Sequence, residues 1–340
     1  MPTWQTYYYR NDKKGTGEKV PPGFIGENMK EKLIIITGPT AVGKTAVSIA
    51  LAKAMNGEII SADSMQIYKY MDIGTAKVTK EEMEGVEHHL IDFINPEEQF
   101  TVADYKENAT NLITYLNNMG KLPIIIGGTG LYINSLVYEL NFVDVPPNQK
   151  LRNKLENIAE IQGKKALLDM LYEIDPVAAE RYTENDIQRI VRAIEITTIS
   201  GKTFDEYGSN FRVVNDKYDV LIYCLNMDRQ KLYERIDKRV DIMLEMGLVE
   251  EVKNLMDSGY GKDLVSMKAI GYKQIMEYLD GDESYDATVE KIKKLSRNYA
   301  KRQLTWFRRD NRIKWLDVEF YKDKDELVEY LIEDIKTHFH

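Results

Sequence analysis

The stretch ITGPTAVGKTAVS, from Ile36 to Ser48, follows the apolar run KLIII and decides how this chain begins to fold. It contains the spacing G-x-x-x-x-G-K-[ST] between Gly38 and Thr45. A loop of this kind, between a buried strand and a helix, points backbone N–H groups and the positive helix end at one anion. Lys44 adds a charge, and Thr45 offers a hydroxyl to Mg²⁺ beside the phosphates. The pattern therefore predicts a di- or triphosphate site and leaves the reaction open.

Apolar runs alternate with helical periodicity along most of the chain. Short buried runs that end in glycine or polar residues predict strands of a parallel sheet, because both faces of such strands are covered. The segments between them have apolar residues at helical spacing and predict helices on the two faces. The expected fold class is α/β, with a P-loop type of parallel sheet flanked by helices. The predicted strands are 32–38, 57–64, 88–94, 122–130 and 218–227, and the predicted helices include 45–55, 102–119 and 287–309.

A change of character between 143 and 213 indicates a second unit. The linker VDVPPNQ is followed by charged helical segments such as KLRNKLENIAEIQ and NDIQRIVRAIEITTIS. We expect 143–213 to be an all-helical insertion, while 29–142 and 214–340 form the sheet domain. Residues 1–28 lack periodic apolar positions and are predicted to be a disordered N-terminal extension.

Composition excludes several classes of protein. No apolar run reaches the length of a membrane span, and the N-terminal residues lack the apolar core of a secretory signal. The single cysteine, Cys224, excludes an internal disulfide and a cysteine-rich zinc site, and its apolar surroundings predict a buried thiol. These features predict a cytoplasmic protein without membrane contact.

Charge is distributed unevenly. The net charge of −9 by itself disfavours nucleic acid, whose phosphates need Lys and Arg. The segment 293–315, however, carries nine basic residues and one acid, with Tyr299, Trp306 and Phe307 between them. Because aromatic rings stack on bases and cations hold phosphates, this segment and QRIVR at 188–192 predict an RNA-binding face. The alternative is that the aromatics belong to the core and the cations are merely solvated; for Trp306 we expect the core.

Two strand ends carry residues suited to chemistry. Asp63 ends the second predicted strand, and neighbouring parallel strands end at one crevice. Its carboxylate can hold a metal through water or accept a proton, but an Asp-Ser pair is equally typical of a turn or helix cap. The glycine-rich stretch 127–130 can present N–H groups and Thr129 to an anion or acceptor, and a packing turn explains it equally well. Spacing alone leaves both questions open.

A row of cations occurs in the segment DRQKLYERIDKRVDIM. Lys231, Arg235 and Arg239 are four residues apart and therefore share one helix face. Such a row suits an anion. Asp237 and Asp241 can pair with it, so a solvated face of mixed charge is the alternative.

Taken together, these motifs resemble one family. The chain contains GPTAVGKT, DSMQIY, MDIGTAK, HHLID, GGTGLY, NDIQRIVRAIE, SGKT, AIGYKQ and AKRQLTWFR, in the order and at the spacing of the bacterial-type tRNA dimethylallyltransferases, also called tRNA isopentenyltransferases. The resemblance extends from about Lys32 to Asp317. It departs at Glu87 and Val78, where the family often has proline, and neither position has a proposed catalytic role.

The resemblance implies that the loop holds the diphosphate of dimethylallyl diphosphate. The dimethylallyl group would pass to the exocyclic N6 of adenosine 37, next to the anticodon of tRNAs that read codons beginning with U. It implies Mg²⁺ as cofactor, the tRNA anticodon stem-loop as partner, and a helical domain that closes over the stem. A monomer is the default expectation. By resemblance, the diphosphate-binding residues are Gly38, Pro39, Thr40, Ala41, Val42, Gly43, Lys44 and Thr45.

The resemblance also assigns roles to single residues. Asp63 is matched to the base that accepts the N6 proton as the new bond forms, because adenine N6 is a poor nucleophile. Lys44, Arg239 and Mg²⁺ at Thr45 are matched to the groups that stabilise charge on the departing diphosphate. An adenine must leave its stack to reach such a site. The residues matched to tRNA contacts are Asp63, Ser64, Met65, Gln66, Thr129, Arg152, Gln188, Arg189, Ile190, Val191 and Arg192.

Three rivals compete with this prediction. A P-loop small-molecule kinase shares the loop, the carboxylate and the fold, but it has no need of the basic segment 293–315. An RNA-binding protein with an inactive phosphate site has no need of Lys44, Thr45, Asp63 and Arg239 together. An adenylate isopentenyltransferase that acts on free nucleotides shares the chemistry, and the segments matched to tRNA contacts argue against it.

Overall fold

The computed structural model describes residues 30–140, 145–203 and 213–339. The predicted disordered extension at 1–28 lies outside the described residues. None of the helices within the described ranges is long and apolar enough to cross a membrane.

The chain divides into two compact units. The first runs to Asn134 and resumes at Asp216, and the second spans Ser135–Asn215. The sequence places the helical insertion at 143–213, within the second unit.

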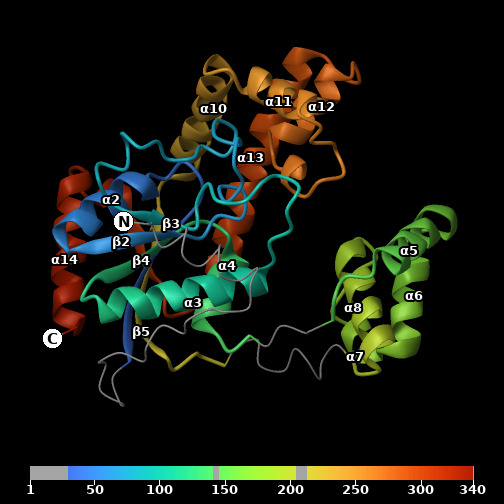
Figure 1. Cartoon of the computed structure of the whole chain (residues 1–340), viewed down its shortest axis with the longest axis horizontal. Coiled ribbons are helices and arrows are strands. Elements are labelled where there is room, and N and C mark those ends of the chain that lie inside the picture. The colour runs from blue at the N-terminus through green and yellow to red at the C-terminus, as the bar shows by residue number, and fades with distance from the viewer. Residues whose placement is uncertain (1–29, 141–144, 204–212, 340) are drawn as a thin grey trace, which may run out of the picture. The chain divides into compact units, whose positions relative to one another are not determined.

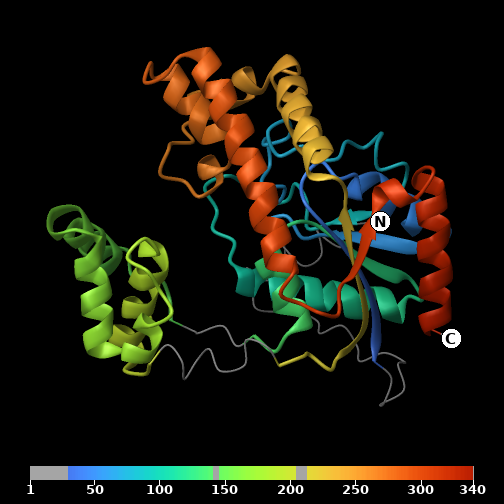
Figure 2. The same cartoon turned by 180° about the vertical axis from the view of Figure 1, so that it is seen from behind.

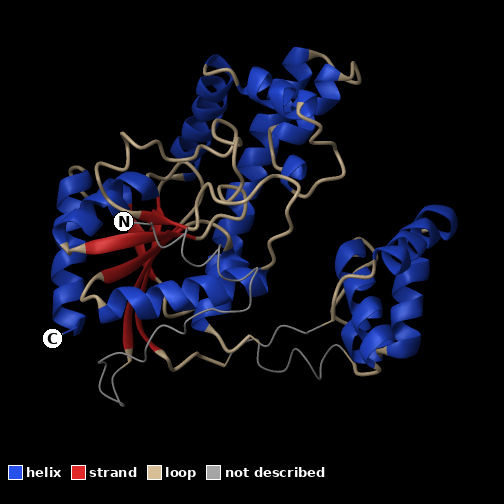
Figure 3. Ribbon diagram, viewed as in Figure 1, coloured by secondary structure: helices blue, strands red, loops and turns tan. Residues whose placement is uncertain are grey.

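A parallel sheet of six strands forms the frame of the first unit, in the order β3-β2-β4-β1-β5-β6 (Figure 1). This confirms the predicted α/β class. Figure 3 shows the strands gathered at the centre of the unit, with helices around them. The strands are β1 (Glu31–Thr37), β2 (Gly57–Ser61), β3 (His88–His89), β4 (Leu122–Ile126), β5 (Tyr218–Asn226) and β6 (Lys314–Asp317).

Four strands differ from the sequence prediction. The strands predicted at 57–64 and 122–130 end earlier, at Ser61 and Ile126. The strand predicted at 88–94 ends at His89, because Leu90 and Asp92 both adopt a positive φ of 55°, which turns the chain out of an extended path. The edge strand β6 was not predicted, because a run of four residues carries too little periodicity.

The sheet order positions the site. β4 lies between β1 and β2, since Ile124 pairs with Ile34 on one side and Ile59 on the other. All three strands point the same way, so the segments after Thr37, Ser61 and Ile126 meet at one edge. The phosphate loop, Asp63 and the glycine stretch therefore converge.

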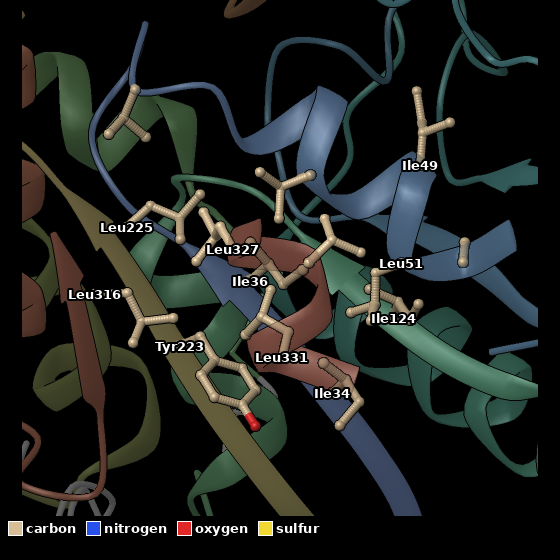
Figure 4. Packing of buried hydrophobic residues seen from close by; sticks show 14 of the residues in the cluster. Ile34, Ile36, Ile49, Leu51, Ile124, Tyr223, Leu225, Leu316, Leu327 and Leu331 are labelled. Atoms are coloured by element: carbon tan, nitrogen blue, oxygen red, sulfur yellow. The ribbon is translucent and has the colours of Figure 1, made fainter. Parts of the chain in front are cut away.

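Helices cover both faces of the sheet. α2 and α14 lie on one side and α3 on the other (Figure 1). On the first side, Ile34 and Ile36 of β1 pack with Ile124, Leu51 and Leu331 (Figure 4). Removing this apolar surface from water stabilises the frame. The helices of the first unit are α2 (Lys44–Ala54), α3 (Val102–Asn118), α10 (Arg229–Glu245), α11 (Leu248–Asp257), α12 (Tyr272–Leu279), α13 (Tyr285–Phe307) and α14 (Lys324–Phe339), with short 3₁₀ turns at Ser266–Lys268 and Val318–Phe320; α4 (Gly130–Val137) begins in it.

The second unit is built from helices around a small core of its own. Leu155, Leu167, Leu171 and Ile194 are buried in that core. The amphipathic period of each segment accounts for the packing, because each helix turns its apolar side inward. The helices are α5 (Gln149–Gln162), α6 (Lys164–Ile174), α7 (Pro176–Ala179) and α8 (Ile187–Ser200).

Candidate functional site

The phosphate loop has the backbone that an anion site needs. Gly38 has a φ of 140°, and a Cβ there would lie 2.5 Å from the carbonyl oxygen of Leu225. Gly43 has a φ of 104° and precedes the first residue of α2. A side chain at either position is therefore strained, and the loop stays wrapped around the helix N-terminus.

Lys44 is held by its own loop. Its Nζ donates to the carbonyl oxygens of Gly38 at 3.0 Å and Pro39 at 2.8 Å. Removal from water lowers the pKa of Lys44 to about 8; Arg239 acts in the same direction, and Asp63 opposes them. A bound diphosphate would stabilise the charged form, so Lys44 is suited to hold an anion.

Asp63 serves as a turn residue and also faces a cavity. Its Oδ1 accepts the backbone N–H of Met65 at 2.9 Å and of Gln66 at 3.4 Å. Its Oδ2 accepts no hydrogen bond from the described part of the chain. The side chain lines the cavity beside Ser64 and Met65. One oxygen therefore holds the turn, which confirms the turn alternative. The role of the carboxylate as a base or metal ligand stays a prediction.

The glycine turn, which we define as Gly127–Gly130, packs closely. A Cβ on Gly127 would lie 2.2 Å from the Ala62 carbonyl oxygen. Thr129 accepts the backbone N–H of Ser64 on its Oγ1 at 3.1 Å, and donates its own N–H to Ala62. Packing thus explains the glycines, and Thr129 fixes the segment that carries Asp63.

A cavity of about 440 Å³ opens beside these elements. One part of its wall is polar and carries Thr40, Asp63 and Arg239. Another part is apolar and comes from α10, α11, α13 and the segment before α12. The cavity can therefore receive a ligand with an anionic head and an apolar tail. The apolar wall consists of Ile236, Val240, Met243, Leu248, Val265, Ile270 and Ile292.

The predicted row of cations on α10 is divided. Arg239 is half-buried in the cavity wall, and burial lowers its pKa while Asp63 raises it. Arg235 is exposed and does not line the cavity, and Lys231 forms an ion pair with Glu319. Of the three cations, only Arg239 lines the cavity. It lies three residues after Ile236 and four before Met243, and both of these α10 residues line the same cavity.

The basic segment 293–315 loses much of its charge to ion pairs. α13 lies beside α10 (Figure 2), and its Lys293 pairs with Asp241 at 2.7 Å and its Arg297 with Asp237 at 2.5 Å. Two further cations of the segment pair with carboxylates of Asp310 and Asp334. The five cations that are exposed and form no ion pair with a described residue are Lys294, Lys301, Arg302, Arg308 and Arg309.

In the second unit, the candidate RNA contacts separate into buried and exposed groups. Ile190 and Val191 lie in the core, because these positions of α8 face the other helices. Their side chains are therefore withdrawn from any ligand, contrary to the sequence prediction. Gln188 and Arg189 are exposed.

Glu195 organises two of the predicted arginines. Arg152 donates to both of its carboxylate oxygens, at 2.9 and 2.7 Å, and Arg192 donates to one at 2.5 Å. The side chain of Glu195 is 0% exposed. Burial would raise the pKa of Glu195, but the hydrogen bonds from both arginines outweigh burial and lower that pKa to about 2.

Some residues of the site were missed by sequence reasoning. The motif AIGYKQ carried no predicted role beyond the resemblance, yet its Ala269, Ile270 and Gly271 line the cavity, as does Lys268 just before it. Gln303 lies within the basic segment and had no predicted role. Its side chain accepts the backbone N–H of Thr40 in the phosphate loop. No local pattern marks a glutamine as buried, so this residue could be found only from the structure.

A phosphate loop, a carboxylate and an arginine that meet around one cavity, at the carboxyl edge of a parallel sheet, define a P-loop protein of the α/β class. The cavity adds an apolar wall to the anion site. The chain belongs to the IPP transferase family, because the family model described as IPP transferase matches residues 66–310.

Several relatives extend this finding. A tRNA dimethylallyltransferase from Alkaliphilus oremlandii (strain OhILAs) is 49% identical over 311 residues, which are 92% of this chain and 99% of that relative. The solved structure of the full-length tRNA isopentenylpyrophosphate transferase from Bacillus halodurans has a TM-score of 0.67 at 44% identity, covering 91% of this chain and 98% of that one. A eukaryotic dimethylallyltransferase acting on tRNA has a TM-score of 0.69 at 30% identity, covering 84% of this chain and 74% of that one.

Proposed function

We propose that this chain is an enzyme that transfers a dimethylallyl group from dimethylallyl diphosphate, the donor, to tRNA. The acceptor is N6 of adenosine 37, next to the anticodon of tRNAs that read codons beginning with U. The cavity is the observation that carries the proposal: Thr40 and Arg239 line its polar part, and apolar residues of α10 and α13 line the rest. An allylic diphosphate has the same division into a charged head and an apolar tail.

The donor's diphosphate is assigned to the phosphate loop. Loop N–H groups, Lys44 and Arg239 supply positive charge where the leaving oxygens become negative. The pKa of both side chains is lowered by burial, so each gains by taking an anionic partner. The bond from the allylic carbon to oxygen breaks, and diphosphate leaves.

Asp63 is assigned as the base. The new bond forms between N6 and the allylic carbon, and N6 then carries a proton that must leave. The Oδ2 of Asp63 is not used by the turn, and the side chain lines the cavity. A carboxylate in hydrogen-bonding reach of N6 can accept that proton.

Mg²⁺ is proposed as cofactor beside Thr45, whose side chain is exposed in the first turn of α2. Within the described ranges, no group of three or more His, Cys, Asp or Glu side chains could hold a metal by itself. A single hydroxyl fits an ion held mainly by phosphate oxygens and water, which is usual for Mg²⁺. When bound, Mg²⁺ would supply charge stabilisation to the leaving group.

The anticodon stem-loop is proposed to contact exposed groups on each unit. The five exposed cations of α13 and the residues after it are suited to RNA phosphates, as is Arg189 of α8. We assign a monomer that acts in the cytoplasm as the working state of the chain.

One incubation tests the proposal. The chain is mixed with Mg²⁺, the donor and an unmodified tRNA that has adenosines at positions 36 to 38, and the digested RNA is analysed by mass. We expect N6-dimethylallyladenosine at position 37. A parallel tube with free AMP as acceptor separates tRNA prenylation from prenylation of nucleotides. ATP consumption with unmodified tRNA would favour the kinase alternative and contradict the proposal.

A further inference from the structure

Gln303 joins two loops that the proposed reaction uses. This residue lies on α13 and is 5% exposed. The Oε1 atom accepts the backbone N–H of Thr40 at 3.0 Å, and Nε2 donates to the carbonyl oxygen of Gly128 at 3.1 Å. An amide offers both a donor and an acceptor, so one side chain satisfies both loops.

The contact is tight on the side of the glycine turn. A Cβ on Gly128 would lie 1.9 Å from the Nε2 atom of Gln303. The turn therefore has room for the glutamine only because residue 128 is glycine. Below this contact, the sheet itself holds the same two segments, since Thr37 donates through Oγ1 to the carbonyl oxygen of Gly127 at 2.9 Å. The glutamine extends that link beyond the strand ends.

Each loop carries a group of the site. Thr40 lines the cavity in the phosphate loop, on the side assigned to the donor. Thr129 follows Gly128 directly and fixes Ser64, the neighbour of Asp63. A shift between the two loops would therefore change the separation between the leaving group and the proton acceptor.

We propose that Gln303 is a positioning residue, which holds the phosphate loop and the glycine turn at a fixed separation so that donor and acceptor meet in line. The inference rests on the proposed function, and it adds a residue that touches neither substrate. Reactions between two bound partners are sensitive to such spacing, and a misplacement of about 1 Å can cost about a hundredfold in rate.

Gln303→Met tests the role, because methionine has a similar volume and forms neither hydrogen bond. Thr288→Val is the matched control: Thr288 is buried on the same helix, and its hydroxyl has no hydrogen-bond partner among the residues that the structure describes. Turnover with the donor and an anticodon stem-loop, stem-loop affinity and thermal midpoint are measured for both variants. For Gln303→Met we expect kcat to fall about tenfold to a hundredfold, with stem-loop affinity and thermal midpoint close to those of the control.

Gln303→Glu provides a second measurement, the pH dependence of kcat, which should not change if Gln303 has a purely structural role. A protonated carboxyl can accept from Thr40 and donate to Gly128 as the amide does, whereas the ionised form cannot donate. Burial raises the pKa of a carboxyl, so kcat of this variant relative to wild type should rise as the pH falls from about 8.5 to about 6, while the ratio for Gln303→Met stays flat.

Two results would overturn the inference. One is wild-type kcat in Gln303→Met, and the other is a loss of kcat matched by an equal loss of stem-loop affinity or of folded protein. Absence of prenylation by the wild-type chain would instead refute the proposed function, so the two failures are distinguishable.

Discussion

Replacing Asp63 with asparagine isolates one property of the site, the charge on a single carboxylate. The amide oxygen can still accept the N–H groups of Met65 and Gln66, which the carboxylate Oδ1 accepts at 2.9 and 3.4 Å. The turn should therefore survive. What the variant loses is an acceptor for the N6 proton at Oδ2.

The expected loss is large and confined to the chemical step. Removing a general base typically costs a factor of about 10² to 10⁴ in kcat, or roughly 3 to 5.5 kcal/mol in the barrier. Donor affinity should hold or improve, because a negative charge near the diphosphate is removed. Electrostatics also change at Lys44, since Asp63 acts to raise the pKa of that lysine.

The assay is prenylation of an anticodon stem-loop under single-turnover conditions, with stem-loop affinity measured separately. Asp323→Asn is the matched control, because Asp323 also accepts two backbone N–H groups through one oxygen and lies at the start of α14, away from the cavity. A rate within tenfold of wild type would refute the assignment of Asp63 as base, and so would a fall in stem-loop affinity as large as the fall in rate.

Further expectations concern charge. Arg239→Gln should raise the donor KM about tenfold or more and leave stem-loop affinity unchanged. Arg235→Gln should leave the donor KM unchanged, because Arg235 is exposed on the same helix and does not line the cavity. The same KM change in both variants would contradict the role of Arg239 at the leaving group. Donor affinity without tRNA should weaken as the pH rises through about 8, where Lys44 becomes neutral, and a flat titration would count against Lys44. Stem-loop affinity should fall with salt at a slope of up to about −3.5 for five exposed cations, and no salt dependence would remove α13 from the interface. The folded pKa of Glu195 is lowered from 4.5 to about 2, so its carboxylate stabilises the second unit above pH 4.5 and that stabilisation is lost as the pH falls toward 2. Glu195→Gln should lower the free energy of unfolding by about 3 kcal/mol near neutral pH. An unchanged unfolding free energy in chemical denaturation would refute this expectation.

Much of the frame follows from local sequence. Glycine spacing at Gly38 and Gly43 predicts the loop, since positive φ values favour glycine whatever the rest of the chain does. Period-3.6 patterns predicted α2, α3 and α13 to within a few residues, and buried apolar runs predicted β1, β2, β4 and β5. Strand β3 was predicted too long, because Leu90 adopts a left-handed backbone that its side chain does not signal.

The sequence predicted the candidate residues of the site, but it did not predict which other residues surround them in the folded chain. Sequence spacing shows that Lys231, Arg235 and Arg239 share a helix face, but it does not show which part of that face borders a cavity. The cavity wall depends on how α10 packs against α13, and that packing brings Arg239 to the wall.

The sequence alone determined the phosphate loop, the parallel sheet and the family of this protein, because those depend on residues near one another along the chain. The tertiary structure decided which charges are available. Arg297 is neutralised by Asp237, which is 60 residues away, while Arg302 five positions later stays exposed. It also brought the buried amide of Gln303 between Thr40 and Gly128. Neutralisation and hydrogen bonding depend on distances in space, and these exist only once the helices have packed.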